Sequence, residues 1–236
     1  SVGKSSLSTW LLFPSGMISE EQRRQMSTIL DDNVHTVEVQ ACINGSDDLD
    51  EIISALFGDA QFKEDVGLSS VNSINWARVM TQTIHYFYAY LQNTKEVGES
   101  MNFSVPCGAF GNLCAGTLAR RMGLPVGKFI AASNNNGVIT KVMSDGVLEK
   151  KTVEETYANA IDIAVPMNFW RYLYFILDEN SNRIRELFTA YQKEGSVSFS
   201  NDEIAKIRSG FLAETINDDQ ILEVIRDTFT EDAYLL

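Results

Sequence analysis

The chain has 236 residues, 44% of them hydrophobic, and 32 acidic against 19 basic side chains give it a formal net charge of −13 at pH 7. This length suits one large α/β domain or two small ones, and the acidic balance, with no basic cluster longer than a pair, excludes nucleic acid and anionic membrane as expected partners. We expect neither a signal peptide nor a membrane span, and the spacing of Cys42, Cys107 and Cys114 predicts reduced thiols, a cytoplasmic location and no metal site.

The first residues include Gly3-Lys-Ser-Ser6, which copies the end of a Walker A loop without its first glycine or its strand, so we interpret it as chance. The chain has no initiator methionine and residues 10–13 already read as a buried strand, so we expect it to be part of a longer protein. A capping box predicts a helix over about 19–30, and alternation predicts a second strand over 34–40. We interpret His35, inside that strand, as a packed or hydrogen-bonded core residue.

Apolar residues recur at helical spacing over 49–57, and the acids in the first turn of this helix suit its dipole. The segment Ser70-Val-Asn-Ser-Ile-Asn-Trp-Ala-Arg78 then turns from a loop into a long helix expected over 76–91. Asn72 and Asn75 either cap this helix or bind a ligand, and the pattern leaves both alternatives open. The dense aromatic side chains of the helix favour a core face over a cofactor site.

Residues 103–126 read as a short strand, a glycine loop, a helix and a stop. Gly108 and Gly111 permit backbone conformations that residues with a Cβ resist, and a helix opening near Gly111 turns unpaired N–H groups toward whatever lies above the loop. A phosphate is the natural occupant of such a place, but many glycine turns between strand and helix bind nothing. Gly123 and Pro125 are expected to end the helix.

A further strand is predicted over 128–132, and the repeated strand–helix order predicts an open, mainly parallel sheet flanked by helices. This strand leads into Ser133-Asn-Asn-Asn-Gly137, and because ligands lie at the carboxyl ends of such strands, we expect this loop and the glycine loop to face one crevice. Later helices are expected near 180–193, 201–209 and 218–230. We therefore predict an α/β region over 1–150 that contains the phosphate-binding loop, and a mainly helical extension of the same large domain over 151–236.

Four segments stand in a fixed order along the chain: Pro14 to Met26; Val71 to Arg78 with Tyr86 to Tyr90; Val105 to Asn112 through Gly123 to Pro125; and Ile130 to Asn136 with Ala160 to Ile163. Together they resemble threonine synthase, a pyridoxal-phosphate enzyme of fold type II, the tryptophan-synthase-β type. The resemblance covers nearly the whole chain. Its Asn-Ser-Ile-Asn-Trp and Gly-x-Phe-Gly-Asn motifs are specific.

The resemblance implies an enzyme that converts O-phospho-L-homoserine and water to L-threonine and phosphate, so its partner is a small phosphorylated amino acid; a homodimer is an open alternative. The cofactor implied is pyridoxal 5'-phosphate, which acts as an electron sink while a lysine forms the internal Schiff base. The cofactor-binding residues implied are Gly108, Ala109, Phe110, Gly111 and Asn112. The substrate-binding residues implied are Asn72, Ser73, Asn75, Asn134 and Asn136.

Three departures from the family pattern limit this interpretation. The family's Schiff-base lysine stands in a Phe-Lys-Asp context, and Lys4, Lys63 and Lys95 do not, so we expect that lysine upstream and assign no catalytic residue to this chain. Ala109 replaces a usual asparagine and Gly137 a usual aspartate. A similar substitution in the phosphate loop is a feature of animal threonine-synthase-like proteins, some of which are phospho-lyases that give 2-oxobutyrate. Residues 1–9 match nothing in the family, and a non-catalytic truncated fragment with a binding or secreted signalling role is a further alternative.

Overall fold

The computed structural model describes residues 7–29, 31–40, 42 and 46–234. The Walker-like residues 3–6 and the predicted helix end at Leu30 lie outside this part. Within it, the strands form three separate sheets, of which the largest has three strands.

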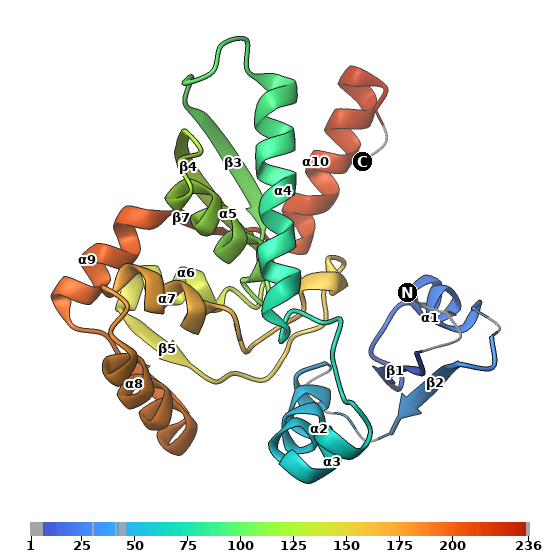
Figure 1. Cartoon of the computed structure of the whole chain (residues 1–236). Helices are drawn as coiled ribbons and strands as arrows, with labels where there is room; N and C mark the ends of the chain where they lie inside the picture. The colour runs from blue at the N-terminus through green and yellow to red at the C-terminus, as the bar shows by residue number, and fades with distance from the viewer. Residues whose placement is uncertain (1–6, 30, 41, 43–45, 235–236) are drawn as a thin grey trace.

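The N-terminal part is a two-stranded parallel unit. Strands β1 (Thr9–Pro14) and β2 (Val34–Val39) pair side by side, and α1 (Glu20–Ser27) connects them. Helix α1 begins with the predicted capping box, in which Ser19 and Gln22 satisfy each other's backbone N–H groups. Figure 1 shows this unit beside the larger body of the molecule.

Two helices follow this unit along the chain. Helix α2 (Ser46–Gly58) contacts β1, and the short α3 (Ala60–Asp65) comes directly after it. The His35 ring lies 4.4 Å from the Trp10 ring, centroid to centroid, so His35 is packed as predicted. It is not a core residue, because it is half-buried and Trp10 is 60% exposed, and only the end of the predicted buried strand 10–13 is buried, at Phe13.

The main sheet has the order β3-β4-β7, with all strands parallel. Its strands are β3 (Met101–Pro106), β4 (Val126–Ser133) and β7 (Leu212–Thr215). Helix α5 (Gly111–Arg121) connects β3 to β4, and the long α4 (Trp76–Asn93) packs against α5. This arrangement confirms the prediction of a parallel sheet flanked by helices (Figure 1).

The C-terminal part adds the helices α6 (Val138–Asp145), α7 (Phe169–Ile176), α8 (Ser181–Glu194), α9 (Asn201–Gly210) and α10 (Asp218–Asp232). The last three confirm the predicted helices. Strands β5 (Val147–Glu149) and β6 (Ser196–Ser198) form an antiparallel pair. The sequence analysis missed α3, α6 and α7 and the short strands β5, β6 and β7. The β5–β6 and β4–β7 pairs join the two predicted regions, whose boundary at residue 150 stays a prediction.

Helix α5 meets α4 and the main sheet at very short range. A Cβ added to Gly116 on α5 would lie 2.7 Å from Cζ of Tyr86 and 2.8 Å from Cε1 of Phe129. The buried side of α4 carries Val79, Thr83, Tyr86 and Tyr90. The core prediction for its aromatic side chains therefore holds for Tyr86 and Tyr90.

A second side of α4 is apolar and exposed. Its large side chains recur at spacings of three and four residues, which places them along one line of the helix. We call this line the α4 stripe; it consists of Trp76, Met80, Ile84, Tyr88 and Leu91. Tyr88 is 66% exposed, so the core prediction was wrong for this aromatic residue. No helix in the described part of the chain has the length and apolar character needed to cross a membrane.

Candidate functional site

The glycine loop connects the end of β3 to the start of α5. Phe110, the N-cap residue of α5, has a left-handed backbone (φ 64°, ψ 7°) and offers no side-chain cap. Its ring is buried against those of Phe169, Tyr172 and Phe211, with centroids 5.1–5.4 Å apart. Aromatic packing therefore holds the residue that bends the loop in a conformation that bulky side chains rarely adopt.

The sequence analysis expected Gly108 and Gly111 to supply the unusual backbone conformation, and that expectation was wrong. Neither is among the positive-φ residues; Phe110 is. The two glycines instead permit close approach: a Cβ at Gly108 would lie 3.0 Å from Cδ1 of Ile163, and one at Gly111 would lie 3.3 Å from Nδ2 of Asn168. Gly123 does have the predicted left-handed conformation, with φ 103°, directly after the α5 C-cap.

The start of α5 presents unpaired backbone donors. Among the described residues, no acceptor is recorded for the N–H groups of Gly111, Asn112 and Leu113, as expected for a first helical turn without a side-chain cap. Gly111 and Asn112 are partly exposed, so their N–H groups are within reach of a ligand. The side chain of Asn112 points elsewhere, because its Oδ1 accepts a 2.6 Å hydrogen bond from the Tyr86 hydroxyl.

The three polar residues predicted before α4 have different surroundings. Asn75 caps the helix, since its Oδ1 accepts from the Ala77 N–H at 3.0 Å. Asn72 is exposed, and its side chain accepts from the Ser73 N–H at 2.6 Å. The hydroxyl of Ser73 accepts from Nδ2 of Asn168 at 3.1 Å, and Ser73 is the member of this group that approaches Gly111. The capping interpretation of Asn75 is thus confirmed.

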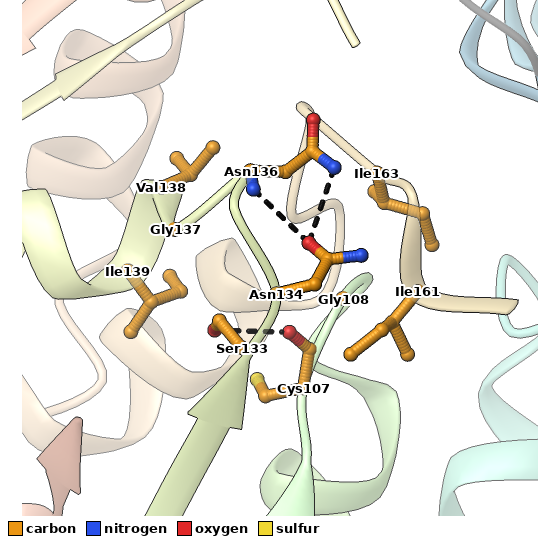
Figure 2. A pocket seen from close by; sticks show the side chains of 10 residues that line it. All are labelled: Cys107, Gly108, Ser133, Asn134, Asn136, Gly137, Val138, Ile139, Ile161 and Ile163. Atoms are coloured by element: carbon orange, nitrogen blue, oxygen red, sulfur yellow. Dashed lines mark hydrogen bonds between the residues drawn. The ribbon is translucent and has the colours of Figure 1, made fainter. Parts of the chain in front are cut away.

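The loop after β4 is held by a buried network. The Asn134 amide nitrogen donates to Oδ1 of Asp162 at 2.6 Å, and the Asn136 amide nitrogen donates to the same atom at 3.2 Å. Asn136 also exchanges hydrogen bonds with the backbone of Glu154, and Asp162 accepts from the hydroxyl of Thr156. Figure 2 shows Asn134 and Asn136 joined by two further bonds to Oδ1 of Asn134. Both side chains are thus engaged within the chain.

The glycine loop and the loop after β4 line one small cavity, as expected from the carboxyl ends of neighbouring parallel strands (Figure 2). Its volume is about 10 Å³, which is room for about one water molecule. The lining residues are Cys107, Gly108, Ser133, Asn134, Asn136, Gly137, Val138, Ile139, Ile161 and Ile163. A phosphate is larger than this space, so the cavity with these dimensions does not hold one.

Sequence reasoning missed three residues that organise this region: Asp162, Asn168 and Arg171. Asp162 lies in a matched family segment, as an acid between two isoleucines, and this was a usable signal. Asn168 and Arg171 are three residues apart at the start of α7, so both face the same side of the helix. Only the structure shows that this side meets the glycine loop and the loop before α4.

Two buried free thiols lie in this region, those of Cys107 and Cys114. Burial raises the pKa of Cys107 and that of Cys114 to about 12 each. Burial also raises the pKa of the Tyr86 hydroxyl, which stays neutral. In the part of the chain that the structure describes, no cluster of three or more His, Cys, Asp or Glu side chains suits a metal ion.

Comparison with known proteins gives relatives over nearly the whole chain, although no family model matches it. A threonine synthase of Pseudomonas aeruginosa is 37% identical over 227 residues, which are 96% of this chain and 48% of the relative. Threonine synthase-like 2 of Rattus norvegicus is 34% identical over 239 residues, with 99% and 49% covered. The chain spans about half the length of these curated relatives.

Solved structures agree with these relatives. The crystal structure of a threonine synthase from Brucella melitensis with bound PLP superposes with a TM-score of 0.84 at 33% identity, covering 96% of this chain and 48% of that one. Threonine synthase from yeast gives a TM-score of 0.81 at 31% identity, with 96% and 46% covered. Over the half of such a protein that it spans, the chain therefore belongs to the threonine synthase family.

Proposed function

We propose that this chain is the phosphate-binding part of a pyridoxal-phosphate enzyme that converts O-phospho-L-homoserine and water to L-threonine and phosphate. The observation that carries the proposal is the first turn of α5, where the N–H groups of Gly111, Asn112 and Leu113 meet no recorded acceptor in the described chain. This turn stands inside the Gly-x-Phe-Gly-Asn motif of a chain related to threonine synthases.

The residues present fit the phosphate of the cofactor. Successive N–H groups at a helix start bind phosphate through hydrogen bonds and the positive end of the helix dipole. Helix α5 has no acidic residue in its first turn, so no carboxylate on that turn repels an anion. The partial exposure of Gly108, Ala109, Gly111 and Asn112 leaves this side of the loop accessible.

When bound, pyridoxal phosphate supplies an electron sink for reactions at the substrate's carbon atoms. In our proposal, this chain contributes orientation: the N–H groups of α5 hold the phosphate, and the Ser73 hydroxyl lies beside Gly111, where a Cβ would be 3.5 Å from Cβ of Ser73. Asn112 takes part through its backbone, because Tyr86 and Gln82 hold its side chain. The imine-forming lysine is assigned to no residue of this chain.

The substrate-binding residues divide into two groups in this proposal. Asn72 and Ser73 are accessible enough to meet a small phosphorylated amino acid, while Asn75 fixes the start of α4. Asn134 and Asn136 are buried, and their side chains hydrogen-bond to residues 154–162. We therefore assign them a structural role: they position the segment whose residues Ile161 and Ile163 pack against Gly108.

The test uses the natural protein that contains this chain. With pyridoxal phosphate it should show the yellow absorbance of an imine, and with O-phospho-L-homoserine it should release phosphate and L-threonine. Absence of imine absorbance at saturating cofactor would sink the enzyme proposal. Imine formation without phosphate release would retain the cofactor site and exclude this substrate.

A second candidate, a phospho-lyase that gives 2-oxobutyrate, is favoured by Ala109. This residue lacks the amide that the family usually places in the loop, and the chain is also similar to threonine synthase-like 2. The carbonyl of Ala109 is engaged within the chain, since it accepts from the N–H and from Nδ2 of Asn168. Mass spectrometry of the product separates the two reactions: L-threonine supports the first, and 2-oxobutyrate supports the second.

A further inference from the structure

Two side chains at the start of α7 connect the loop before α4 to the glycine loop. Nδ2 of Asn168 donates to the hydroxyl of Ser73 at 3.1 Å and to the carbonyl of Ala109 at 3.2 Å. Arg171 donates to the carbonyls of Ser73 and Ile74, each at 2.6 Å. Arg171 also donates to Oδ1 of Asn168, so the two side chains act as one unit.

Asn168 does not use its side chain as its position predicts. It is the N-cap residue of α7, where an asparagine normally accepts a hydrogen bond from the first turn of its own helix. Here no side-chain cap bond is formed, and the amide bonds instead to two other segments of the chain. Asn168 is 1% exposed, so each of these bonds is made away from water. The Asn168 side chain therefore stabilises the loop before α4 and the glycine loop, and it does not cap α7.

Arg171 brings a positive charge to the same place. It is half-buried, its guanidinium lies 5.8 Å from the centre of the Trp76 ring, and no acidic side chain of the described residues forms a recorded ion pair with it. Its recorded acceptors are all neutral oxygen atoms. Burial lowers the pKa of this group, in line with a partly desolvated charge. An uncompensated positive charge next to Ser73 favours an anion nearby.

We propose that Asn168 and Arg171 are positioning residues for the cofactor phosphate, an inference that rests on the proposed function. Asn168 fixes the Ser73 hydroxyl against the Ala109 carbonyl, and Arg171 fixes the backbone of the loop before α4. Together they hold Ser73 beside the open N–H groups of α5, so that the hydroxyl and the N–H groups form one phosphate-binding edge. The 3.3 Å approach of Nδ2 of Asn168 to a Cβ placed at Gly111 shows how closely this unit borders that edge.

The test compares pyridoxal phosphate with pyridoxal, which lacks the phosphate, in the natural protein that contains this chain. The variants are Asn168→Ala, Arg171→Gln and Arg171→Lys; the lysine keeps the charge but lacks the planar fork that reaches two carbonyls. The matched control is Arg208→Gln, because Arg208 also donates to two backbone carbonyls, those of Met143 and Ser144. Dissociation constants and melting temperatures are measured for every variant.

We expect all three variants to bind pyridoxal phosphate at least about tenfold more weakly while their affinity for pyridoxal changes less than about twofold, a loss of about 1.4 kcal/mol assigned to the phosphate. The control should match the wild type for both ligands. Equal losses for both ligands, or a loss that follows the melting temperature, would show a purely structural role and overturn the inference. Undiminished binding of pyridoxal phosphate by the variants would also overturn it and leave the proposed function standing.

A wild-type protein that binds no pyridoxal phosphate would overturn the proposed function together with this inference. If Asn168→Ala fails to fold, Arg171→Lys carries the test. The lysine keeps the charge and about the length of the side chain. If the ratio of the dissociation constants for pyridoxal and pyridoxal phosphate in this variant equals that of the wild type, the inference is rejected.

Discussion

Phe110 fixes the shape of the glycine loop through its side chain. A left-handed backbone at a residue other than glycine costs about 1–3 kcal/mol, and burial of the Phe110 ring among Phe169, Tyr172 and Phe211 offsets this cost. The glycines on either side then let Ile163 and Asn168 approach. Phe110 therefore fixes the bend of the loop, and Gly108 and Gly111 leave space for its neighbours. These contacts shape the loop without a phosphate.

Replacing Gly111 by valine tests the phosphate site at the residue scale. The new side chain would enter the space next to Asn168 and Ser73 and displace the first turn of α5. We expect the affinity for pyridoxal phosphate to fall at least about tenfold, which is about 1.4 kcal/mol. Gly58→Ala is the control, since a Cβ there meets nothing within 4 Å. Retained affinity in Gly111→Val would place the phosphate elsewhere.

The buried thiols predict how stability depends on pH. The pKa of a thiol is about 8.5 in an unfolded chain, against about 12 for Cys107 and Cys114 in the fold. Between these values the unfolded state loses thiol protons that the folded state keeps, so the free energy of unfolding falls as pH rises above about 8.5. Urea unfolding at pH 8 and pH 10 measures this fall. A Cys107→Ala, Cys114→Ala variant should show a smaller fall; an equal fall would assign it to other groups.

At the scale of elements, the α4–α5 contact holds the glycine loop in place. The close contacts of Gly116 with Tyr86 and Phe129 leave no room for a methyl group. Tyr86 also binds the carbonyl and the side chain of Asn112 at the start of α5. The packing of two helices is thereby coupled to the first turn that offers the N–H groups.

Gly116→Ala should therefore destabilise the protein by about 1–3 kcal/mol, because two aromatic rings have to move to admit the new Cβ. Urea denaturation measures the change in the free energy of unfolding, again with Gly58→Ala as the control at an uncrowded helical position. Equal stabilities of Gly116→Ala and the wild type would mean that the rings shift without cost and that the contact is looser than the distances indicate.

The elements show which features the sequence alone predicts. Helices α1, α2, α4, α5, α8, α9 and α10 and strands β1 to β4 carry local signals, namely caps, apolar periodicity and a glycine stop, and were predicted. Strands β5 and β6, with three residues each, are too short for alternation to mark them, and β7 depends on pairing with the distant β4.

The residues of the candidate site likewise divide into those marked by local sequence motifs and those that depend on distant contacts. Motifs within a few residues predict the glycine loop and the Asn75 cap. The roles of Asn168 and Arg171 depend on hydrogen bonds to segments distant along the chain, so no local pattern marks them. Asp162 also acts on a distant loop, but its place between two isoleucines in a matched segment was a usable signal. The left-handed residue was also misplaced, because the aromatic rings that stabilise Phe110 come from α7 and from the residue before β7.

At the scale of the whole molecule, the α4 stripe is an exposed apolar surface on a highly acidic chain. Ile84, near its middle, is 64% exposed. A row of large exposed apolar side chains favours association, while a net charge of −13 opposes it at low ionic strength. We therefore expect this chain to associate with itself through the stripe more strongly as salt concentration rises.

Sedimentation velocity at low and high salt measures this association. Ile84→Glu should reduce it, since a carboxylate would be desolvated in the contact. Val97→Glu is the control, because Val97 is 89% exposed but lies outside the stripe. Equal association of both variants and the wild type would exclude the α4 stripe as the contact. The homodimer expected as an alternative stays a prediction.

The pairing of β4 with β7 also orders the events of biosynthesis. Ile130 pairs with Leu212. The segment between them, with several helices and the β5–β6 pair, is therefore synthesised after β3 and β4 and before the third strand of the main sheet, β7, can pair. Until then β4 has an open edge that can pair with another nascent chain. Any translational pause before residue 212 prolongs that exposure, and codon choice in the segment between β4 and β7 should therefore affect the yield of folded protein more than codon choice after β7.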